Sequence, residues 1–320
     1  MATESRPEPP GTANNGLTGL LDRMHPVVAA LAGATSTSSS GAFVKLSGVN
    51  AGTAAFLRCF LALFALVPMA IAEYRKVGPR PARLLLMDVA AGLLLGVDYV
   101  LWSQSIQDVG ASIATILINI QVIVFPLLVR IFSGTRLPGP FILAAPVMLI
   151  GVALAGGAIG SAEPGSSPVS GAVYGTAAGV AFAGYLFLSR LGGGTRHSVL
   201  PVCTSTAAAA VSALVLGSVW TGIDLDLGWN QWAWMAALAV FGQVLAWLLV
   251  GSALPRLAPS TGAALLLLQP VQGVVIGIAL LGERPTATQI LGCVLVVLAV
   301  WVSGRSARRP RQPAASNDPR

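Results

Sequence analysis

The chain has few of the residues on which soluble proteins, metal sites and redox chemistry depend. Only 10% of its 320 residues are charged, and it holds three cysteines, two histidines and two lysines. Cys59, Cys203 and Cys293 all lie inside apolar runs, which is typical of small buried hydrophobes, so we predict neither disulfides nor a metal site. The basic surplus of +7 is spread over short segments and the C-terminal tail, which argues against nucleic acid as a partner.

Apolar residues dominate the composition instead. They make up 55% of the chain, which also contains 36 glycines, and the mean hydropathy is +0.77. These values lie far from those of soluble domains and exclude a water-soluble globule. Because one membrane-spanning helix needs about 20 apolar residues, the composition is enough for about ten spans.

Ten apolar runs follow one another, separated by proline, glycine and charge. A linker at 159–170, rich in Ser, Pro and Gly, divides them into five and five. We therefore predict an all-α polytopic membrane protein with ten transmembrane helices: a disordered cytoplasmic tail at 1–24, a first five-helix repeat at 25–158, a second at 171–304 and a basic cytoplasmic tail at 305–320. The runs are 26–46, 52–72, 83–106, 110–132, 137–158, 171–190, 199–220, 229–252, 259–281 and 285–302.

The positions of Lys and Arg predict the orientation in the membrane, because positively charged loops stay on the cytoplasmic side. With the N-terminus inside, 16 of the 19 basic residues fall in cytoplasmic segments; the others are Lys45, Arg58 and Arg284. Arg58 alone lies inside a span. We predict a multi-pass protein of the cell membrane with both termini in the cytoplasm.

Five spans per half give the second half the opposite orientation, which is the arrangement of inverted-repeat transporters. A shift of 148 positions, without gaps, pairs identical residues in the two halves. Chance matching between Leu-, Ala- and Gly-rich helices is the alternative, but the charge pattern agrees with inversion. The pairs are Ser112 with Ser260, Leu117 with Leu265, Gln121 with Gln269, Gly134 with Gly282, Arg136 with Arg284, Ile142 with Ile290 and Gly156 with Gly304.

The segment 259–285 carries a family resemblance. Pro259-Ser260-Thr261-Gly262-Ala263-Ala264, then Gln269-Pro270, then Leu281-Gly282-Glu283-Arg284-Pro285 resemble the second repeat of EamA-type transporters in the drug/metabolite transporter superfamily. The resemblance covers both halves. It implies ten helices in two inverted five-helix repeats around a central cavity, and export of amino acids, other metabolites or drugs. The first repeat departs from the pattern at Val122 and Thr135.

Polar side chains at membrane depth are the functional candidates, since they are costly unless they face protein or water. In the hydroxyl-rich tract 35–40, helical spacing places Ser36, Ser39 and Ser40 on one face. They either line a cavity or bond carbonyls of their own helix and pack against neighbours. Both interpretations stay open.

Arg58 and Asp98 lie at matching depths in the second and third spans. Since each charge alone costs about 3 kcal/mol at the membrane centre, we expect the two to pair. The pair either faces the cavity, where an anionic group or a proton competes for one partner, or is a permanent salt bridge. Asp88 lies nearer the inner surface, and we expect it to be an interfacial partner.

Amides and an aromatic ring complete the candidate pathway. Asn119 ends a polar stripe on the fourth span, Gln269 and Gln272 share a face of the ninth, and Tyr185 is near the middle of the sixth. Bonds between helices and core packing are the alternative roles. Pro126 and Pro270 are candidate hinges, because a proline leaves the carbonyl four residues earlier unbonded.

We therefore predict a secondary-active transporter that exports a small metabolite, amino acid or drug by alternating access. No phosphate-binding loop, nucleophile elbow or metal-ligand spacing appears, so we predict no enzyme and no cofactor. A passive channel or facilitator and an intramembrane enzyme are the alternatives. The expected partners are a small-molecule substrate and the lipid bilayer, with proton coupling through Asp98; the sequence predicts no oligomeric state.

Overall fold

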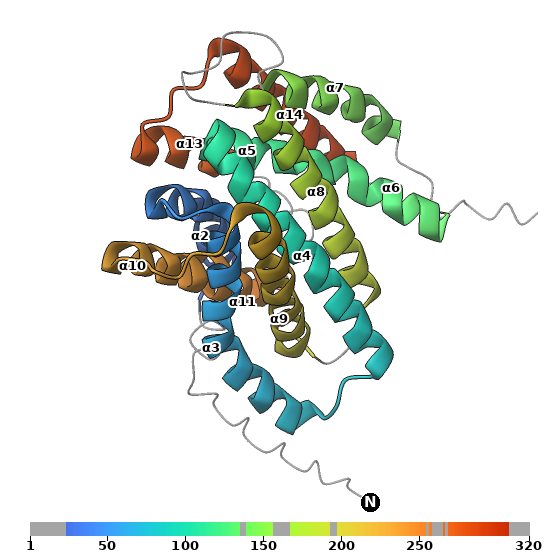
Figure 1. Cartoon of the computed structure of the whole chain (residues 1–320). Coiled ribbons are helices and arrows are strands. Elements are labelled where there is room, and N and C mark those ends of the chain that lie inside the picture. Colours follow the sequence, from blue (N-terminus) through green and yellow to red (C-terminus); the bar gives the residue numbers. More distant parts are fainter. Residues whose placement is uncertain are drawn as a thin grey trace, which may run out of the picture.

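The computed structural model describes residues 24–134, 139–155, 167–192, 197–253, 256–257, 265 and 268–306. Regular structure in these ranges is helical, and no strand occurs among them. The helices pack into one bundle, as Figure 1 shows. The predicted all-α class is confirmed for this part of the chain.

The first half contributes six α-helices and one 3₁₀ turn. The fourth apolar run is not one regular helix, because a 3₁₀ turn joins its two parts. The elements are α2 (Pro26–Ser47), α3 (Ala51–Val77), α4 (Ala82–Val109), α5 (Ala111–Leu117), η1 (Ile118–Ile120), α6 (Gln121–Ser133) and α7 (Gly139–Ala155).

The second half contains two wide π-helical stretches. One extends a helix at its C-terminal end, and the other lies inside the run 229–252. The elements are α8 (Pro168–Leu191), α9 (Val199–Leu216), η2 (Gly217–Thr221), α10 (Trp229–Ala237), η3 (Leu238–Leu245), α11 (Ala246–Ala253), α13 (Gln269–Leu281) and α14 (Ala287–Ser306).

Local sequence signals determine where helices begin and end. The side chain of Asn50 accepts the N–H of Thr53 at 2.8 Å and caps α3. Gly134 ends α6 in the left-handed conformation, with φ 65°, that a Cβ would strain. Pro168 starts α8 three residues before the predicted start of the second repeat at 171, because proline suits a first helical turn. At the other end of the chain α14 reaches Ser306, so the predicted tail begins as helix.

Among the described residues, seven helices are long and apolar enough to cross a membrane: 26–47, 51–77, 82–109, 111–133, 168–191, 199–221 and 229–250. Three shorter apolar helices cover 144–155, 269–281 and 287–299. Each of the ten predicted runs thus contains a helix, and the crossing of the last three stays a prediction. The described residues reach only parts of the predicted tails and linker.

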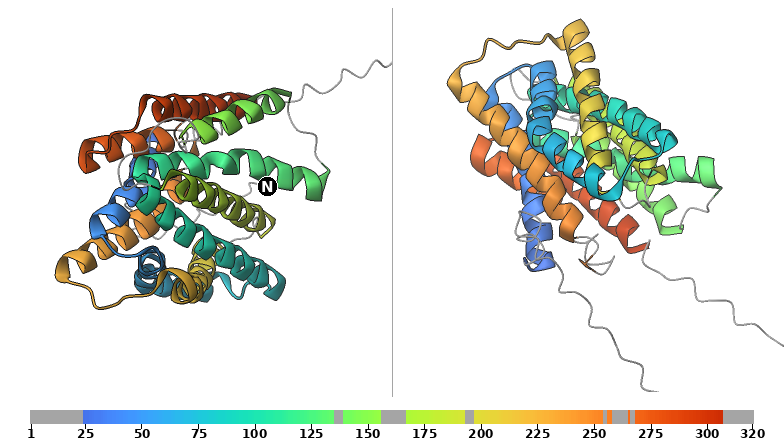
Figure 2. Two further views of the ribbon diagram at one scale, coloured as in Figure 1. Left: turned by 45° about the horizontal axis from the view of Figure 1, so that its top comes forward. Right: turned by 90° about the horizontal axis from the view of Figure 1, so that it is seen from below.

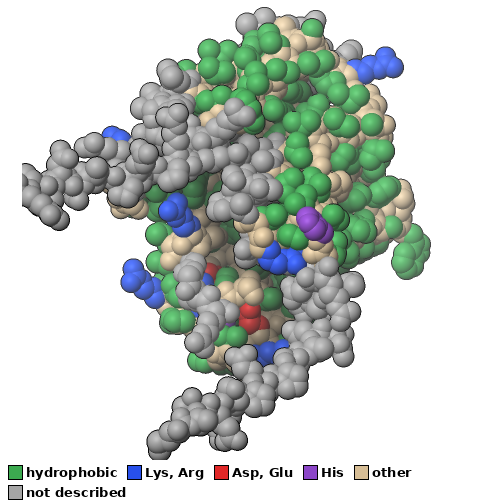
Figure 3. All heavy atoms as spheres, turned by 180° about the vertical axis from the view of Figure 1, so that it is seen from behind, with side chains coloured by type: hydrophobic (Ala, Val, Ile, Leu, Met, Phe, Trp, Pro, Cys, Tyr) green, Lys and Arg blue, Asp and Glu red, His purple; other side chains and the backbone are tan. Residues whose placement is uncertain are grey.

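Large hydrophobic side chains face outward and small residues fill the interior. Phe64, Ile131 and Trp229 are 70%, 71% and 92% exposed, whereas Ala and Gly are frequent between the helices. Figure 3 shows one face on which hydrophobic side chains cover much of the described surface and charged ones gather toward its lower part. Soluble proteins bury such large hydrophobic side chains, so this distribution suits a protein surrounded by lipid.

Helices from the two halves pack against each other. Helix α4 packs on α8 and α9, α3 packs on α9, α2 contacts α11 and α13, and α7 lies along α14. The pairing of α7 with α14 is visible at one edge of the bundle in Figure 2. Gly92 and Gly96 let α4 approach α9 closely, since a Cβ at either would meet the backbone of α9.

Candidate functional site

Arg58 on α3 lies in the interior of the bundle and is 6% exposed. Its Nε donates to Oε1 of Gln243 at 3.0 Å, and its Nη2 donates to the carbonyl of Gly242 at 2.9 Å. The guanidinium also lies over the ring of Tyr99, 4.0 Å from its centroid. Hydrogen bonds and a cation–π contact therefore stabilise a buried positive charge.

Gln243 connects three helices around that arginine. Its oxygen also accepts from the Tyr99 hydroxyl at 2.8 Å, and its Nε2 lies 3.4 Å from Oγ1 of Thr206 on α9. The residue is 1% exposed and belongs to the π-helical stretch η3. Wide turns of this kind often occur at functional sites. We call Arg58, Asp98, Tyr99, Thr206 and Gln243 the central cluster.

Asp98 corrects the prediction of a direct pair. Both charged residues lie in the described part of the chain, yet Arg58 and Asp98 form no ion pair there. Nε and Nη2 of Arg58 donate to Gln243 and Gly242 instead. Asp98 is 1% exposed, and its Oδ1 has no hydrogen-bond partner among the described residues.

Two further polar atoms near the cluster are buried without a partner in the described structure. They are Nε1 of Trp102, whose ring lies 5.9 Å from the Arg58 guanidinium carbon, and Oγ of Ser40, which lies against Gly242. Unsatisfied buried polar atoms are rare because each is costly, so a group of them calls for an explanation such as a missing ligand or water. This group comprises an acceptor, a donor and a hydroxyl.

The hydroxyl tract of α2 divides between two neighbours. Ser40 faces Gly242, and Ser39 bonds the carbonyl of Ser36 within its own helix at 2.8 Å. The bonds to α13 come from other members of the tract. Oγ of Ser38 donates to the carbonyl of Gln269 at 3.0 Å and lies 3.3 Å from Oε1 of Gln272, whose Nε2 donates to Oγ1 of Thr35 at 3.0 Å.

Asn119 lies in the 3₁₀ turn η1, where its Nδ2 donates to the Thr115 carbonyl at 2.7 Å. Pro126 lies inside α6, so the irregular turn precedes this proline by several residues. Pro270 lies in the first turn of α13, where its missing N–H costs little. Its predicted effect on the carbonyl of Leu266 lies outside the described residues.

Tyr185 is 4% exposed and packs edge-on to Trp247 at 6.2 Å between ring centroids. Both rings line a cavity of about 190 Å³ that lies between α4, α8, α9 and α11. Arg80, Asp88, Ser189, Gly192, His197, Pro201, Val202 and Ser205 also line it. The sequence singled out Tyr185 but did not predict the other residues that line the cavity, because they come from distant segments of the chain.

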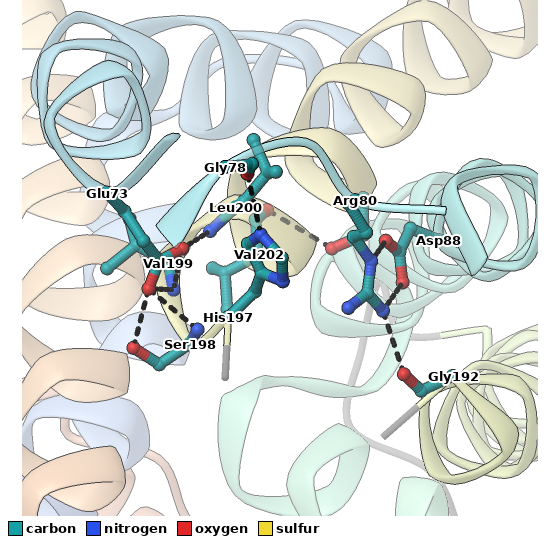
Figure 4. Close-up of polar contacts among 11 residues, drawn as sticks. Glu73, Gly78, Arg80, Asp88, Gly192, His197, Ser198, Val199, Leu200 and Val202 are labelled. Carbon is teal, nitrogen blue, oxygen red and sulfur yellow. Dashed lines mark hydrogen bonds and ion pairs between the residues drawn. The ribbon is translucent and has the colours of Figure 1, made fainter. Parts of the chain in front are cut away.

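The connection between α3 and α4 is bound to the start of α9 and the end of α8 at the mouth of that cavity (Figure 4). Arg80 donates to Asp88 from Nε at 2.6 Å and from Nη2 at 3.0 Å, and its Nη2 also donates to the Gly192 carbonyl at 2.8 Å. The sequence predicted Asp88 to be an interfacial partner, and the structure pairs it with Arg80; its position at the membrane surface stays a prediction. Nε2 of His197 donates to the Gly78 carbonyl at 3.0 Å.

Two glutamates bind helix N-termini at opposite ends of the chain's fold. Glu73 accepts the N–H groups of Ser198, Val199 and Leu200 at 2.7 to 3.0 Å, as Figure 4 shows. Glu283 accepts the N–H groups of Ala111 and Ser112 at 2.5 and 2.9 Å. A carboxylate at a helix N-terminus satisfies donors that the helix leaves free. Both bonds join distant parts of the chain.

Comparison with known proteins identifies related sequences. The model of the EamA-like transporter family matches this chain twice, over residues 24–157 and 169–305. The two matched copies correspond to the two halves on either side of the predicted linker. Arg58, Asp98 and Tyr99 belong to the first copy, and Thr206 and Gln243 belong to the second.

Named relatives share most of the length. The chain is 25% identical over 268 residues to an uncharacterized transporter of Archaeoglobus fulgidus, which covers 82% of this chain and 90% of that protein. It is 30% identical over 226 residues to the threonine/homoserine exporter RhtA of Salmonella typhimurium, covering 69% and 72%. A chain of known crystal structure aligns with a TM-score of 0.57 at 17% identity over 89% of this chain and 99% of that chain, which shows a shared fold.

Proposed function

We propose that this chain, which belongs to the EamA-like transporter family, exports a small amino acid by alternating access through the central cluster. The family membership makes it a transporter of small molecules in a membrane. The central cluster joins α3 and α4 of the first copy to α9 and η3 of the second. A site at the boundary of two repeats is where alternating access places the transported solute.

The observation that carries this proposal is a buried arginine over the ring of Tyr99, together with an oxygen of the preceding residue, Asp98, that is buried without a partner among the described residues. Charged residues inside membrane spans are rare and mark substrate or ion pathways. An α-amino acid carries an ammonium and a carboxylate group. Asp98 suits the first and Arg58 the second, and the unpartnered atoms of Ser40 and Trp102 offer further bonds.

The relatives support an amino acid as the first compound to test. The 30% identical relative is named a threonine/homoserine exporter. We carry over only the substrate class. The inverted arrangement of ten spans, with both termini in the cytoplasm, is part of the proposal and rests on the 148-position shift and the distribution of Lys and Arg.

Proton coupling through Asp98 is the further step of the proposal. Asp98 is the acidic residue of the central cluster, and a carboxylate that exchanges between a proton and a substrate ammonium group links the two fluxes. Arg58 remains charged throughout, because arginine does not lose its proton in proteins. The carboxylate is therefore the group that changes its charge.

Purified protein in proteoliposomes tests the proposal. We expect saturable movement of radiolabelled L-threonine or L-homoserine, and accumulation against its gradient when a pH gradient is imposed. The Asp98→Asn variant keeps the shape of the side chain but cannot cycle a proton, so it should lose the response to the pH gradient. Protein-free liposomes are the control.

Three results would contradict parts of the proposal. Flux that stops at equal concentrations under every gradient would favour the passive facilitator. An Asp98→Asn variant that inserts normally and keeps its pH response would exclude the proton role of Asp98. Absence of flux for both amino acids would refute the proposed substrate class.

A further inference from the structure

The cavity lined by Tyr185 and Trp247 is separate from the central cluster but ends beside it. Ser205 lines the cavity, and the next residue, Thr206, contacts Gln243 of the cluster at 3.4 Å. Successive residues of a helix point in directions about 100° apart, so α9 presents one hydroxyl to each region. The rings of Tyr185 and Trp247 pack edge-on in its lining.

The lining of the cavity includes one positive and one negative side chain, Arg80 and Asp88. Arg80 and Asp88 form a two-point ion pair in which the side chains are only 2% and 4% exposed. A solute with a single charge would leave one partner of this pair buried and uncompensated, which is strongly unfavourable. A zwitterion brings both charges, so its carboxylate can replace Asp88 on Arg80 while its ammonium group replaces Arg80 on Asp88.

The size of the cavity restricts the solute further. Its volume of about 190 Å³ lies below the range of about 300 to 1,000 Å³ that is usual for sites of drug-sized ligands. The hydroxyls of Ser189 and Ser205 add hydrogen-bonding groups, and the rings of Tyr185 and Trp247 add apolar surface. These walls suit a compact solute that has both polar and apolar parts.

We propose that this cavity is a second binding site for the transported solute, specific for small zwitterions, and that the Arg80–Asp88 pair occupies the place of the zwitterion's two charges when the site is empty. This inference rests on the proposed function and names the solute class at a site distinct from the central cluster. Since Nη2 of Arg80 also donates to the Gly192 carbonyl at 2.8 Å, exchange of its partners loosens the contact between the α3–α4 connection and α8. Binding of the solute is thereby linked to separation of the α3–α4 connection from α8.

Protection of a cysteine from a thiol reagent measures occupancy of the cavity directly. Ser189 is replaced by cysteine in a chain whose Cys59, Cys203 and Cys293 are replaced by alanine, and labelling by a neutral maleimide is timed on the full-length protein in detergent. The probes are L-threonine, L-threoninamide, which lacks the carboxylate, and 2,3-dihydroxybutanoate, which lacks the ammonium group. At ten times its dissociation constant a ligand leaves about one-eleventh of sites free, so we expect L-threonine to slow labelling about tenfold.

Both singly charged probes should protect poorly at the same concentration. The Asp88→Asn variant should raise the half-protecting concentration of L-threonine about tenfold or more, the factor for one lost charge-assisted hydrogen bond. Glu73→Gln is the matched control, because Glu73 joins α3 to α9 at the same end of the fold without lining the cavity. It should leave protection unchanged.

Efflux of L-threonine from proteoliposomes, measured in parallel, separates the two proposals. Transport without protection of S189C would overturn the second site and leave the proposed function intact. Protection without transport would support the site and refute the proposed function for this solute. Equal protection by all three probes would overturn the zwitterion requirement, and this comparison stands even where Asp88→Asn fails to fold.

Discussion

Gln243 determines which partners the buried Arg58 takes. Its single oxygen accepts from Nε of Arg58 at 3.0 Å and from the hydroxyl of Tyr99 at 2.8 Å. A neutral amide satisfies the donors of the guanidinium without cancelling its charge. In the proposed mechanism Arg58 can therefore still bind a carboxylate of the substrate, and Asp98 forms no ion pair with Arg58 in the described structure.

Replacement of Gln243 by leucine tests this role. The Gln243→Leu variant removes a hydrogen bond to a charged group, which contributes about 1.5 to 3 kcal/mol, and leaves Arg58 with one acceptor fewer in the interior. We expect transport in proteoliposomes to fall more than about tenfold, since about 1.4 kcal/mol corresponds to that factor. Thr206→Val is the control, because it removes only the 3.4 Å contact and should keep most of the activity. Equal losses in both variants would contradict a special role for Gln243.

The sequence identified the charged members of the cluster but not their partner. Arg58 and Asp98 stand out because a charged side chain inside an apolar run is costly to bury unless it has a partner or a function. Gln243 is the amide in the middle of the run 229–252, since Asn230 and Gln231 lie at its start. It gives the same kind of signal, although weaker, because an amide is less costly in a membrane than a charge. Its contact with Arg58 depends on the π-helical stretch η3, which no pattern in the sequence predicts.

Irregular turns, rather than prolines, interrupt the described helices near the centre. The sequence made Pro126 a candidate hinge, yet α6 continues through it and the 3₁₀ turn lies at Ile118–Ile120. Close packing of α8 accounts for this position: a Cβ on Gly179 would lie 2.5 Å from the carbonyl oxygen of Ile118. A neighbouring helix thus shapes the turn, and such tertiary effects are absent from a local sequence pattern.

The contact of α4 with α9 depends on glycine at position 92. A Cβ there would lie 2.7 Å from the Cα of Ser205 and from the Cβ of Ala208, and these atoms cannot move without the helix. We expect Gly92→Ala to separate the two helices and to destabilise the fold by about 1 to 3 kcal/mol, the usual range for overpacking. The measurement is the thermal transition of the purified protein in detergent.

Gly184→Ala provides the comparison for this prediction. The new Cβ would meet the Cδ1 of Leu94 at 2.8 Å, which is the far end of a flexible side chain and can rotate away. The variant should therefore lose little stability. A Gly184→Ala protein as unstable as Gly92→Ala would show that the rigid backbone of α9 is not what limits position 92.

At the scale of the whole molecule, long apolar runs were sufficient to predict the helical class. Every predicted apolar run contains a helix, and the family model matches one copy on each side of the linker. The cavity beside Asp88 could not be predicted in this way. It is formed by Asp88, Tyr185, Ser205 and Trp247 from four different helices, and only the packing of these helices brings them together.

The membrane topology gives the last prediction, because five spans separate Lys76 from Asp226 in the ten-span arrangement. An odd number places the two residues on opposite sides of the membrane, with Lys76 inside and Asp226 outside. One of the five is α7, whose described apolar part, 144–155, is shorter than the seven spans that meet the length criterion. If α7 does not cross, both residues lie on the same side.

Single cysteines in a cysteine-free chain distinguish these arrangements. A membrane-impermeant maleimide added to intact cells should label D226C, while K76C, S5C and S316C should react only after the cells are opened. S316C adds a test of α13 and α14, since three spans separate it from Asp226 and the loss of one would bring it outside. Labelling of K76C in intact cells together with D226C, or of S5C and S316C from opposite sides, would refute the ten-span inverted arrangement, and with it the passage of one solute between two oppositely oriented repeats.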